Sequence, residues 1–307
     1  MKNRKFLISL CVVCFAGLAQ SCVSSAASAE EYYSIGMAYY EIGKYEEAEK
    51  WLAKASSVKK TMHASEYNLG RILYENGHYN DALKHFERVL KSDSNNVMAL
   101  KAAAYTEIML DNLEKADLYY SRVLQIEPES ADDGYNHALV LYAMKKYPEA
   151  EAVLDKFSYN IPENKNTLLL LARAQHMQKK IQAIDTYTTW LLKNKDPLVS
   201  YEYALVLEEA GYYARAMETL REALAEMKDD TASLKKATVR FELAKLLLIA
   251  DPENEAGIIE LKGAVTDGFS EIDALETLME NDRVIKTNKT EIQDVISELK
   301  SKVAFNP

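Results

Sequence analysis

The sequence predicts an all-α fold in which about seven helix–turn–helix units stack into a solenoid that ends in a helical cap. Only 10 Gly and 6 Pro occur in 307 residues, whereas helix-favouring Ala, Leu, Glu and Lys abound. A small residue is also followed, twelve positions later, by Ala, and this pair recurs along the chain. Successive pairs lie 34, 34, 34, 34, 32 and 40 residues apart, a period typical of stacked helical repeats. The pairs are Gly36/Ala48, Gly70/Ala82, Ala104/Ala116, Ala138/Ala150, Ala172/Ala183 (one residue shorter), Ala204/Ala216 and Ala244/Ala256.

The small residues mark the place where the two helices of each unit touch. Only Gly, Ala or Ser lets the two backbones approach there, and larger apolar residues such as Leu69, Leu73 and Phe86 then fill the flanks. A Gly near the end of the first helix can take the left-handed conformation that stops it. Three turns carry such a residue: Gly43, Gly77 and Gly211.

Residues 29 to about 270 resemble tetratricopeptide repeats (TPR). The first unit carries the family pattern as Tyr32-x2-Ile35-Gly36-x2-Tyr39, then Ala48-x3-Leu52-x2-Ala55, and the second as Leu69-Gly70-x2-Leu73, then Ala82-x3-Phe86. The resemblance implies a right-handed α-solenoid, here with units at about 29–62, 63–96, 97–130, 131–164, 165–196, 197–230 and 237–267. The seventh unit departs from the pattern, because Glu260 falls on an expected apolar site.

Two segments interrupt or end the repeats. Six extra residues fall around Glu226 to Lys236, and the pattern stops after Gly268 and Phe269. Because a solenoid must cover its last apolar face, we expect residues 268–307 to form the helical cap. The apolar residues that predict two helices there are Leu275, Leu278, Met279, Val295, Ile296 and Leu299.

The first residues resemble an export signal of the bacterial lipoprotein type. Three cations precede an apolar run from Phe6 to Ala19, which is too short to span a bilayer comfortably. Cys22 follows in Leu18-Ala19-Gln20-Ser21-Cys22, which resembles the site where lipid is attached before cleavage. We therefore expect a signal peptide at 1–21, a lipid on Cys22 and a linker at 22–28. Cleavage after Ala29, in the small-x-small sequence Ala27-Ser28-Ala29, is the alternative.

Charge and motifs argue against nucleic-acid binding and catalysis. The net charge is −10, with 47 acidic and 37 basic residues, whereas nucleic-acid binders present basic surfaces. None of the common hydrolase, zinc, nucleotide or phosphate-loop motifs occurs, and the five His do not have metal-ligand spacing. We expect no enzyme activity, no cofactor and no metal site; a catalytic site within 268–307 would have neither His nor Cys to use.

A concave, tyrosine-rich surface is the candidate binding site. In this family the first helix of each unit lines the inner curve, and positions five, nine and twelve of a unit share one face. Tyr suits recognition, because it offers apolar area and a polar tip with few rotamers to freeze, although Tyr at these positions is also common in the family. We expect an extended or helical apolar partner segment carrying some acid. The predicted groove consists of Tyr33, Met37, Tyr40, Tyr67, Arg71, Tyr74, Lys101, Tyr105, Tyr135, Tyr142, Arg173 and Tyr201.

These observations predict a non-catalytic scaffold of the bacterial cell envelope that binds proteins or peptides. The lipid on Cys22 would hold it to a membrane on the periplasmic side, and Val23 after that Cys favours the outer membrane. An accessory subunit of a periplasmic solute-transport system is the alternative function, which a ring-like or trimeric oligomer would favour. The sequence gives neither the partner nor the oligomeric state.

Overall fold

The computed structural model describes residues 28–59, 63–158 and 165–305, and these form sixteen helices and no strand. The predicted signal peptide, Cys22 and most of the linker lie outside the described residues. The chain divides into two compact units, with the boundary between Val153 and Leu154.

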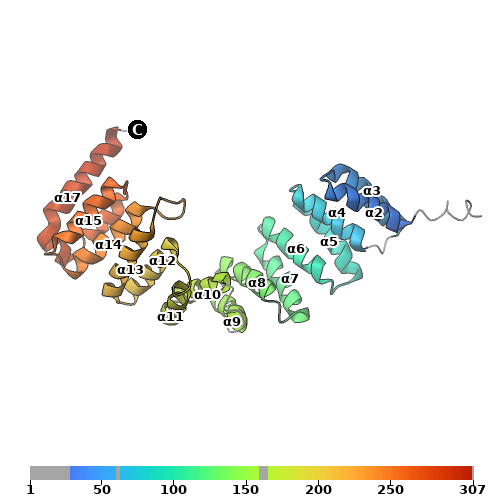
Figure 1. The fold of residues 1–307 in the computed structure, drawn as a ribbon, viewed down its shortest axis with the longest axis horizontal. Helices are drawn as coiled ribbons and strands as arrows, with labels where there is room; N and C mark the ends of the chain where they lie inside the picture. The colour runs from blue at the N-terminus through green and yellow to red at the C-terminus, as the bar shows by residue number, and fades with distance from the viewer. Residues whose placement is uncertain (1–27, 60–62, 159–164, 306–307) are drawn as a thin grey trace, which may run out of the picture. The chain divides into compact units, whose positions relative to one another are not determined.

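The first unit is a row of antiparallel helix pairs, which Figure 1 shows in blue to green. From α2 to α8, each helix packs against the next in the chain. The first helices of the successive pairs α2, α4, α6 and α8 begin 34 residues apart, which confirms the predicted repeat as a structural one. The bounds are α2 (Ala29–Glu41), α3 (Tyr45–Val58), α4 (His63–Glu75), α5 (Tyr79–Ser92), α6 (Val97–Met109), α7 (Leu113–Ile126), α8 (Ala131–Ala143) and α9 (Tyr147–Ser158), the last of which crosses into the second unit.

The two helices of a repeat come close together at the small residues, as the sequence predicts. The Cα of Gly36 faces Leu52, and a Cβ built on Gly36 would lie 2.7 Å from the Cγ of Leu52. Ala48, Ala82, Ala104 and Ala116 are fully buried. Small residues therefore set the spacing between the helices, as the sequence predicts.

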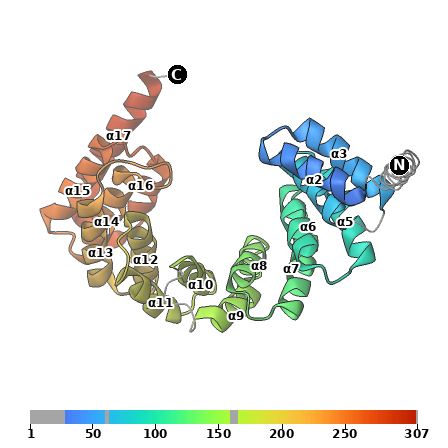
Figure 2. The same cartoon turned by 45° about the vertical axis from the view of Figure 1, so that its right-hand side comes forward.

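The second unit continues with three further pairs and the C-terminal helices. A buried apolar cluster around Trp190 and Leu207 joins α10 to α14, and a second cluster around Leu248 and Leu261 holds α16 and α17 against α14 and α15. The ribbon in Figure 2 shows these last four helices grouped together. Leu275, Leu278, Val295, Ile296 and Leu299 are buried in the second cluster, so the two predicted C-terminal helices form and cover the last repeat. The bounds are α10 (Lys165–Met177), α11 (Gln182–Leu191), α12 (Pro197–Glu209), α13 (Tyr213–Glu226), α14 (Lys236–Ala250), α15 (Glu255–Thr266), α16 (Ile272–Leu278) and α17 (Asp282–Phe305).

The last pair, α14 and α15, corrects the predicted contact at Ala256. A four-residue connection, 251–254, joins these helices, and the Asn254 side chain caps α15 by accepting from the Ala256 N–H at 2.9 Å. The longer connection moves the packing face by one residue, so Gly257, and not Ala256, approaches Leu248. Because of this shift, Glu260 does not occupy the apolar packing position, and its carboxylate lies 3.6 Å from the Arg240 Nε.

The turn inside a repeat uses a left-handed residue whether or not that residue is Gly. Successive turns carry positive φ at Gly43 (73°), Gly77 (78°), Asp111 (60°), Lys145 (60°), Lys179 (56°) and Gly211 (81°). The left-handed conformation costs a non-Gly residue roughly 1–2 kcal/mol in the folded state. Gly avoids this cost, but it loses about 0.5–1 kcal/mol because its unfolded state has more conformational entropy.

Replacing Lys145 by Gly should therefore stabilise the first unit by about 0.5–1 kcal/mol. Lys145 is exposed, with φ of 60°, so the change removes backbone strain and no core contact. Chemical denaturation followed by circular dichroism measures the effect. Ala152→Gly, at an exposed site within α9, is the control and should cost about 1 kcal/mol. Equal losses in the two variants would contradict the prediction.

Candidate protein-binding groove

Five of the predicted groove residues lie together in the first unit, around a groove of about 540 Å³ between α4 and α6. Phe86 of α5, which is 1% exposed, lies at its base, and Met98 and Tyr105 are 60% and 43% exposed beside it. We call this the α4–α6 groove. It is lined by Tyr67, Arg71, Tyr74 and Glu75 of α4, Phe86 of α5, and Met98, Lys101, Ala102 and Tyr105 of α6.

The aromatic walls of the groove are held by packing against second helices. The Tyr67 ring lies 5.7 Å from that of Phe86, and the Tyr74 ring meets that of Tyr79 edge-on at 5.3 Å. Such ring pairs add about 0.5–1.5 kcal/mol beyond the area they bury. These contacts orient the Tyr67 and Tyr74 rings along the groove.

Tyrosines at position twelve have a packing role that the sequence analysis did not assign. Tyr40 lies against Tyr45, and Tyr142 against Tyr147, with ring centroids 5.5 and 5.2 Å apart, in the same way as Tyr74 and Tyr79. Each pair joins the end of a first helix to the first residue of the second. Part of the tyrosine stripe thus serves to close the turn of each repeat.

The three predicted residues of α2 tie the first repeat to the second. Tyr33, Met37 and Tyr40 pack on the core cluster formed by α3 and α4. The Tyr33 hydroxyl accepts from Asn68 at 3.2 Å, and the Tyr40 hydroxyl accepts from Arg71 at 2.7 Å. They do not line the α4–α6 groove.

The predicted cations are already paired within the protein. Arg71 lies 3.9 Å from Glu75, and Lys101 lies 2.6 Å from Asp133. Partial burial acts to lower the pKa of Lys101, but the hydrogen bonds and charges of Asp133 and Glu127 together outweigh it and raise that pKa. The sequence analysis expected these cations to attract acidic residues of a partner segment. Because Arg71 and Lys101 already have carboxylate partners within the protein, they do not support that expectation.

The remaining predicted residues lie on α8 and in the second unit. Tyr135 is partly buried on α8. In the second unit the Arg173 guanidinium forms a two-pronged bridge to Glu202, with bonds of 2.8 and 2.9 Å. Tyr201 packs on the core of that unit, and its burial, with the charge of Glu242, raises the pKa of Tyr201 to about 12.

Met98 and Ala102 line the groove although the sequence analysis did not select them. They stand four residues apart on α6 and share a face with Lys101 and Tyr105, so helical spacing is the signal that would have found them. Ala102 leaves room over Phe86 that a larger side chain would fill.

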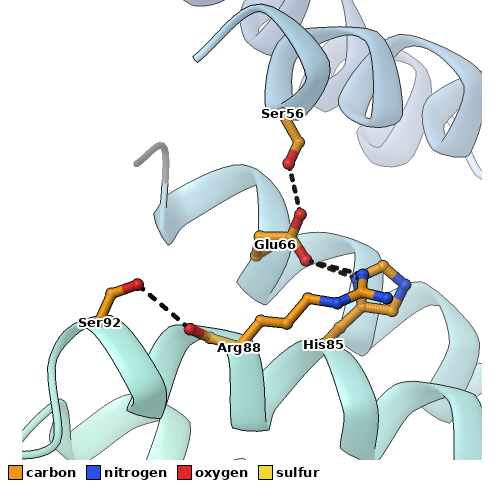
Figure 3. A network of polar contacts seen from close by, with 5 residues as sticks. All are labelled: Ser56, Glu66, His85, Arg88 and Ser92. Carbon is orange, nitrogen blue, oxygen red and sulfur yellow. Dashed lines mark hydrogen bonds and ion pairs between the residues drawn. The ribbon is translucent and has the colours of Figure 1, made fainter. Parts of the chain in front are cut away.

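A separate polar network, formed by Ser56, Glu66, His85 and Arg88, joins α3, α4 and α5 (Figure 3). The Glu66 carboxylate accepts from the Ser56 hydroxyl, lies 2.8 Å from the His85 Nδ1 and accepts from Arg88 at 3.3 Å. The hydrogen bond to His85, opposed by desolvation and helped by Ser56, lowers the pKa of Glu66 to about 2. Sequence spacing did not indicate this network.

Within the described residues, no cluster of three His, Cys, Asp or Glu side chains has the arrangement of a metal site. In the same part of the chain, no helix has the length and apolarity required to cross a bilayer.

Three segments of the chain match the family described as "Tetratricopeptide repeat", at residues 29–61, 65–96 and 132–165. The 34-residue helix pairs with small residues at the crossing agree with this match. These three segments are tetratricopeptide repeats, and the fold is an α-solenoid of TPR units.

A bacterial lipoprotein is similar to this chain in sequence. An "Uncharacterized lipoprotein" of Treponema pallidum is 25% identical over 122 residues, which cover 40% of this chain and 62% of that protein. The chain thus spans less than two thirds of that relative. A TPR protein of Parabacteroides merdae has a similar structure, with 22% identity, a TM-score of 0.54, and coverage of 82% of this chain and 99% of that one.

A further structural neighbour is YrrB, described as "a TPR protein with an unusual peptide-binding site". It is 16% identical, with a TM-score of 0.50, and the match covers 57% of this chain and 91% of YrrB. At these identities the two structures show the fold. TPR folds typically serve as scaffolds for protein–protein interaction and are generally non-catalytic.

Proposed function

We propose that this TPR protein is a non-catalytic scaffold of the bacterial cell envelope, which binds a protein or peptide partner in the α4–α6 groove. The observation that carries the proposal is the groove itself, about 540 Å³ in volume, with an aromatic wall and exposed Met98 and Tyr105. Exposed apolar area next to preformed aromatic rings is the usual composition of a protein-binding site. The peptide-binding site named for YrrB agrees with it.

The envelope setting rests on the N-terminal sequence and one relative. A basic start, an apolar run and Cys22 have the order of a lipoprotein signal, and a relative is named a lipoprotein. A lipid on Cys22 would place the repeats on a membrane facing the periplasm, and Val23 favours the outer membrane. The intact mass of the exported chain tests this, because cleavage before Cys22 with acylation gives a mass that Cys22→Ser abolishes.

Met98→Glu should reduce partner capture from detergent-solubilised envelopes at least about tenfold, the equivalent of 1.4 kcal/mol. The change puts a carboxylate in the groove, and it should preserve the fold because Met98 is 60% exposed in the first turn of α6, where an acidic residue is favourable. Quantitative mass spectrometry of the captured proteins measures the loss. Alanine substitution of Tyr67, Tyr74 or Tyr142 is a poorer test, because their rings pack on other helices or turns.

Leu118→Glu is the matched control. Leu118 is 67% exposed on α7 of the same unit and does not line the groove, so the same carboxylate there should leave capture unchanged. Equal capture by wild type and Met98→Glu, or no specific partner in any sample, would reject the proposed function.

A further inference from the structure

We propose that the α4–α6 groove selects an uncharged partner segment, which inserts a bulky aliphatic or aromatic side chain over Phe86. The inference rests on the proposed function, because it names the chemistry of the partner that this groove would take. It follows from how the charges and the apolar surface of the groove are arranged.

An acidic partner would gain little from the groove's cations. Lys101 is held by Asp133 at 2.6 Å and by Glu127 at 3.3 Å, and the Asp133 side chain is only 5% exposed. Drawing Lys101 towards a partner would leave a buried carboxylate without its counter-ion, which is strongly unfavourable. Lys101 is therefore committed to the protein's own carboxylates.

Arg71 is committed in the same way. It donates to the Tyr40 hydroxyl at 2.7 Å and to Asn68 at 3.3 Å, and its guanidinium lies over the Tyr40 ring, 5.0 Å from the centroid. The Glu75 carboxylate accepts a hydrogen bond from the Tyr40 hydroxyl at 2.6 Å and lies 3.9 Å from the Arg71 guanidinium. A basic partner would thus find the one carboxylate that lines the groove already hydrogen-bonded, and it gains as little as an acidic one.

The apolar part of the groove, by contrast, is available. Met98 and Tyr105 expose 60% and 43% of their surface, and Ala102 between them leaves space above the buried ring of Phe86. A volume of about 540 Å³ falls within the range of roughly 300–1,000 Å³ that is usual for ligand pockets. This space suits a side chain such as Leu, Met, Phe or Trp.

Two tyrosine hydroxyls can orient the rest of the segment. The hydroxyl groups of Tyr67 and Tyr74 form no hydrogen bond with the described residues, whereas the Tyr40 hydroxyl forms two within the protein. A phenol donates to an uncharged acceptor such as a backbone carbonyl. The partner class is accordingly a neutral peptide segment with one bulky apolar anchor.

Selection of a random 12-residue peptide library against the full chain tests the proposal. The recovered peptides should be rich in Leu, Met, Phe or Trp and poor in Asp and Glu. The Kd of a fluorescent copy of the strongest peptide, measured by anisotropy, should change less than about threefold between 0.05 and 0.5 M NaCl, because screening weakens only charge-based contacts.

Three variants separate apolar anchoring from charge recognition. Met98→Glu should weaken the peptide at least about tenfold, whereas Met98→Leu and Arg71→Gln should each change the Kd less than about threefold. Acidic peptides, a tenfold loss of affinity in high salt, or a loss in Arg71→Gln equal to that in Met98→Glu would each overturn the inference. If those results appear while envelope capture still depends on Met98, the proposed function stands and only the partner chemistry is wrong; recovery of no peptide overturns the inference directly.

Discussion

Replacing Gly70 by Leu is expected to lower the free energy of unfolding of the first unit by about 3 kcal/mol. Gly70 is buried where α4 crosses α5, and a Cβ on it would lie 2.5 Å from the Cε1 and 2.9 Å from the Cδ1 of Phe86. The Phe86 ring is 1% exposed and packs on Tyr67, so it has little room to turn aside. The helices must separate, and denaturation in guanidinium measures the cost.

Two further variants show whether the clash with Phe86 is the cause. Ala64→Leu, at an exposed position of α4, should change stability by less than about 0.5 kcal/mol. In a double-mutant cycle with Phe86→Ala, the Leu at position 70 should cost at least about 1 kcal/mol less than in the wild-type background, because the ring is gone. An equal cost in both backgrounds would show that the crossing is not set by this contact.

The repeat and its crossings could be predicted from the sequence because they depend on backbone geometry. Gly36 and Gly70 have no side chain at the point where the helices touch, and only a small residue satisfies that condition. A period of 34 residues repeats the condition along the chain. The seventh crossing was misplaced by one residue, because the length of the 251–254 connection, and not the spacing pattern, decides that Gly257 faces Leu248.

Sequence spacing could predict that some of the candidate groove residues lie close together, but it could not predict their ion pairs. Helical spacing brings Tyr67, Tyr74 and Tyr105 to one surface. The partners of Lys101 and Arg173, however, lie 32 and 29 residues further along, on the next first helix. Side-chain rotamers and the distance between neighbouring first helices decide which of these residues form ion pairs. The cations that the sequence analysis assigned to partner binding are therefore paired within the fold.

The Glu66 network was beyond sequence reasoning for a related reason. Its members come from three helices, with Ser56 and His85 separated from Glu66 by 10 and 19 residues (Figure 3). No motif relates these positions, and each residue type is common on helix surfaces. Only the stacking of the first two repeats makes them neighbours, and their meeting has a measurable consequence for stability.

Glu66→Gln is expected to lower the free energy of unfolding by at most about 3 kcal/mol at neutral pH, and this difference should vanish near pH 2. The pKa of Glu66 falls from 4.5 in the unfolded chain to about 2 in the folded one, chiefly through the bond to His85. A depressed carboxyl pKa stabilises the fold fully above pH 4.5, and the contribution is lost as pH falls from there to about 2. Since the Glu66 side chain is only 14% exposed, solvent screens the network weakly.

Denaturation of both proteins between pH 7 and pH 2 measures this difference directly. Other carboxylates titrate over the same range, but they do so in both proteins, so their contributions cancel in the comparison. Glu30→Gln is the matched control: Glu30 pairs with Lys59 at 3.0 Å but is 58% exposed, so its removal should matter far less. A constant gap between Glu66→Gln and wild type across this pH range would mean that the carboxylate acts by shape and hydrogen bonding alone. A gap that closes between pH 4.5 and 2 shows that the charge of Glu66 contributes to the stability of the fold, in addition to the apolar contacts between the first two repeats.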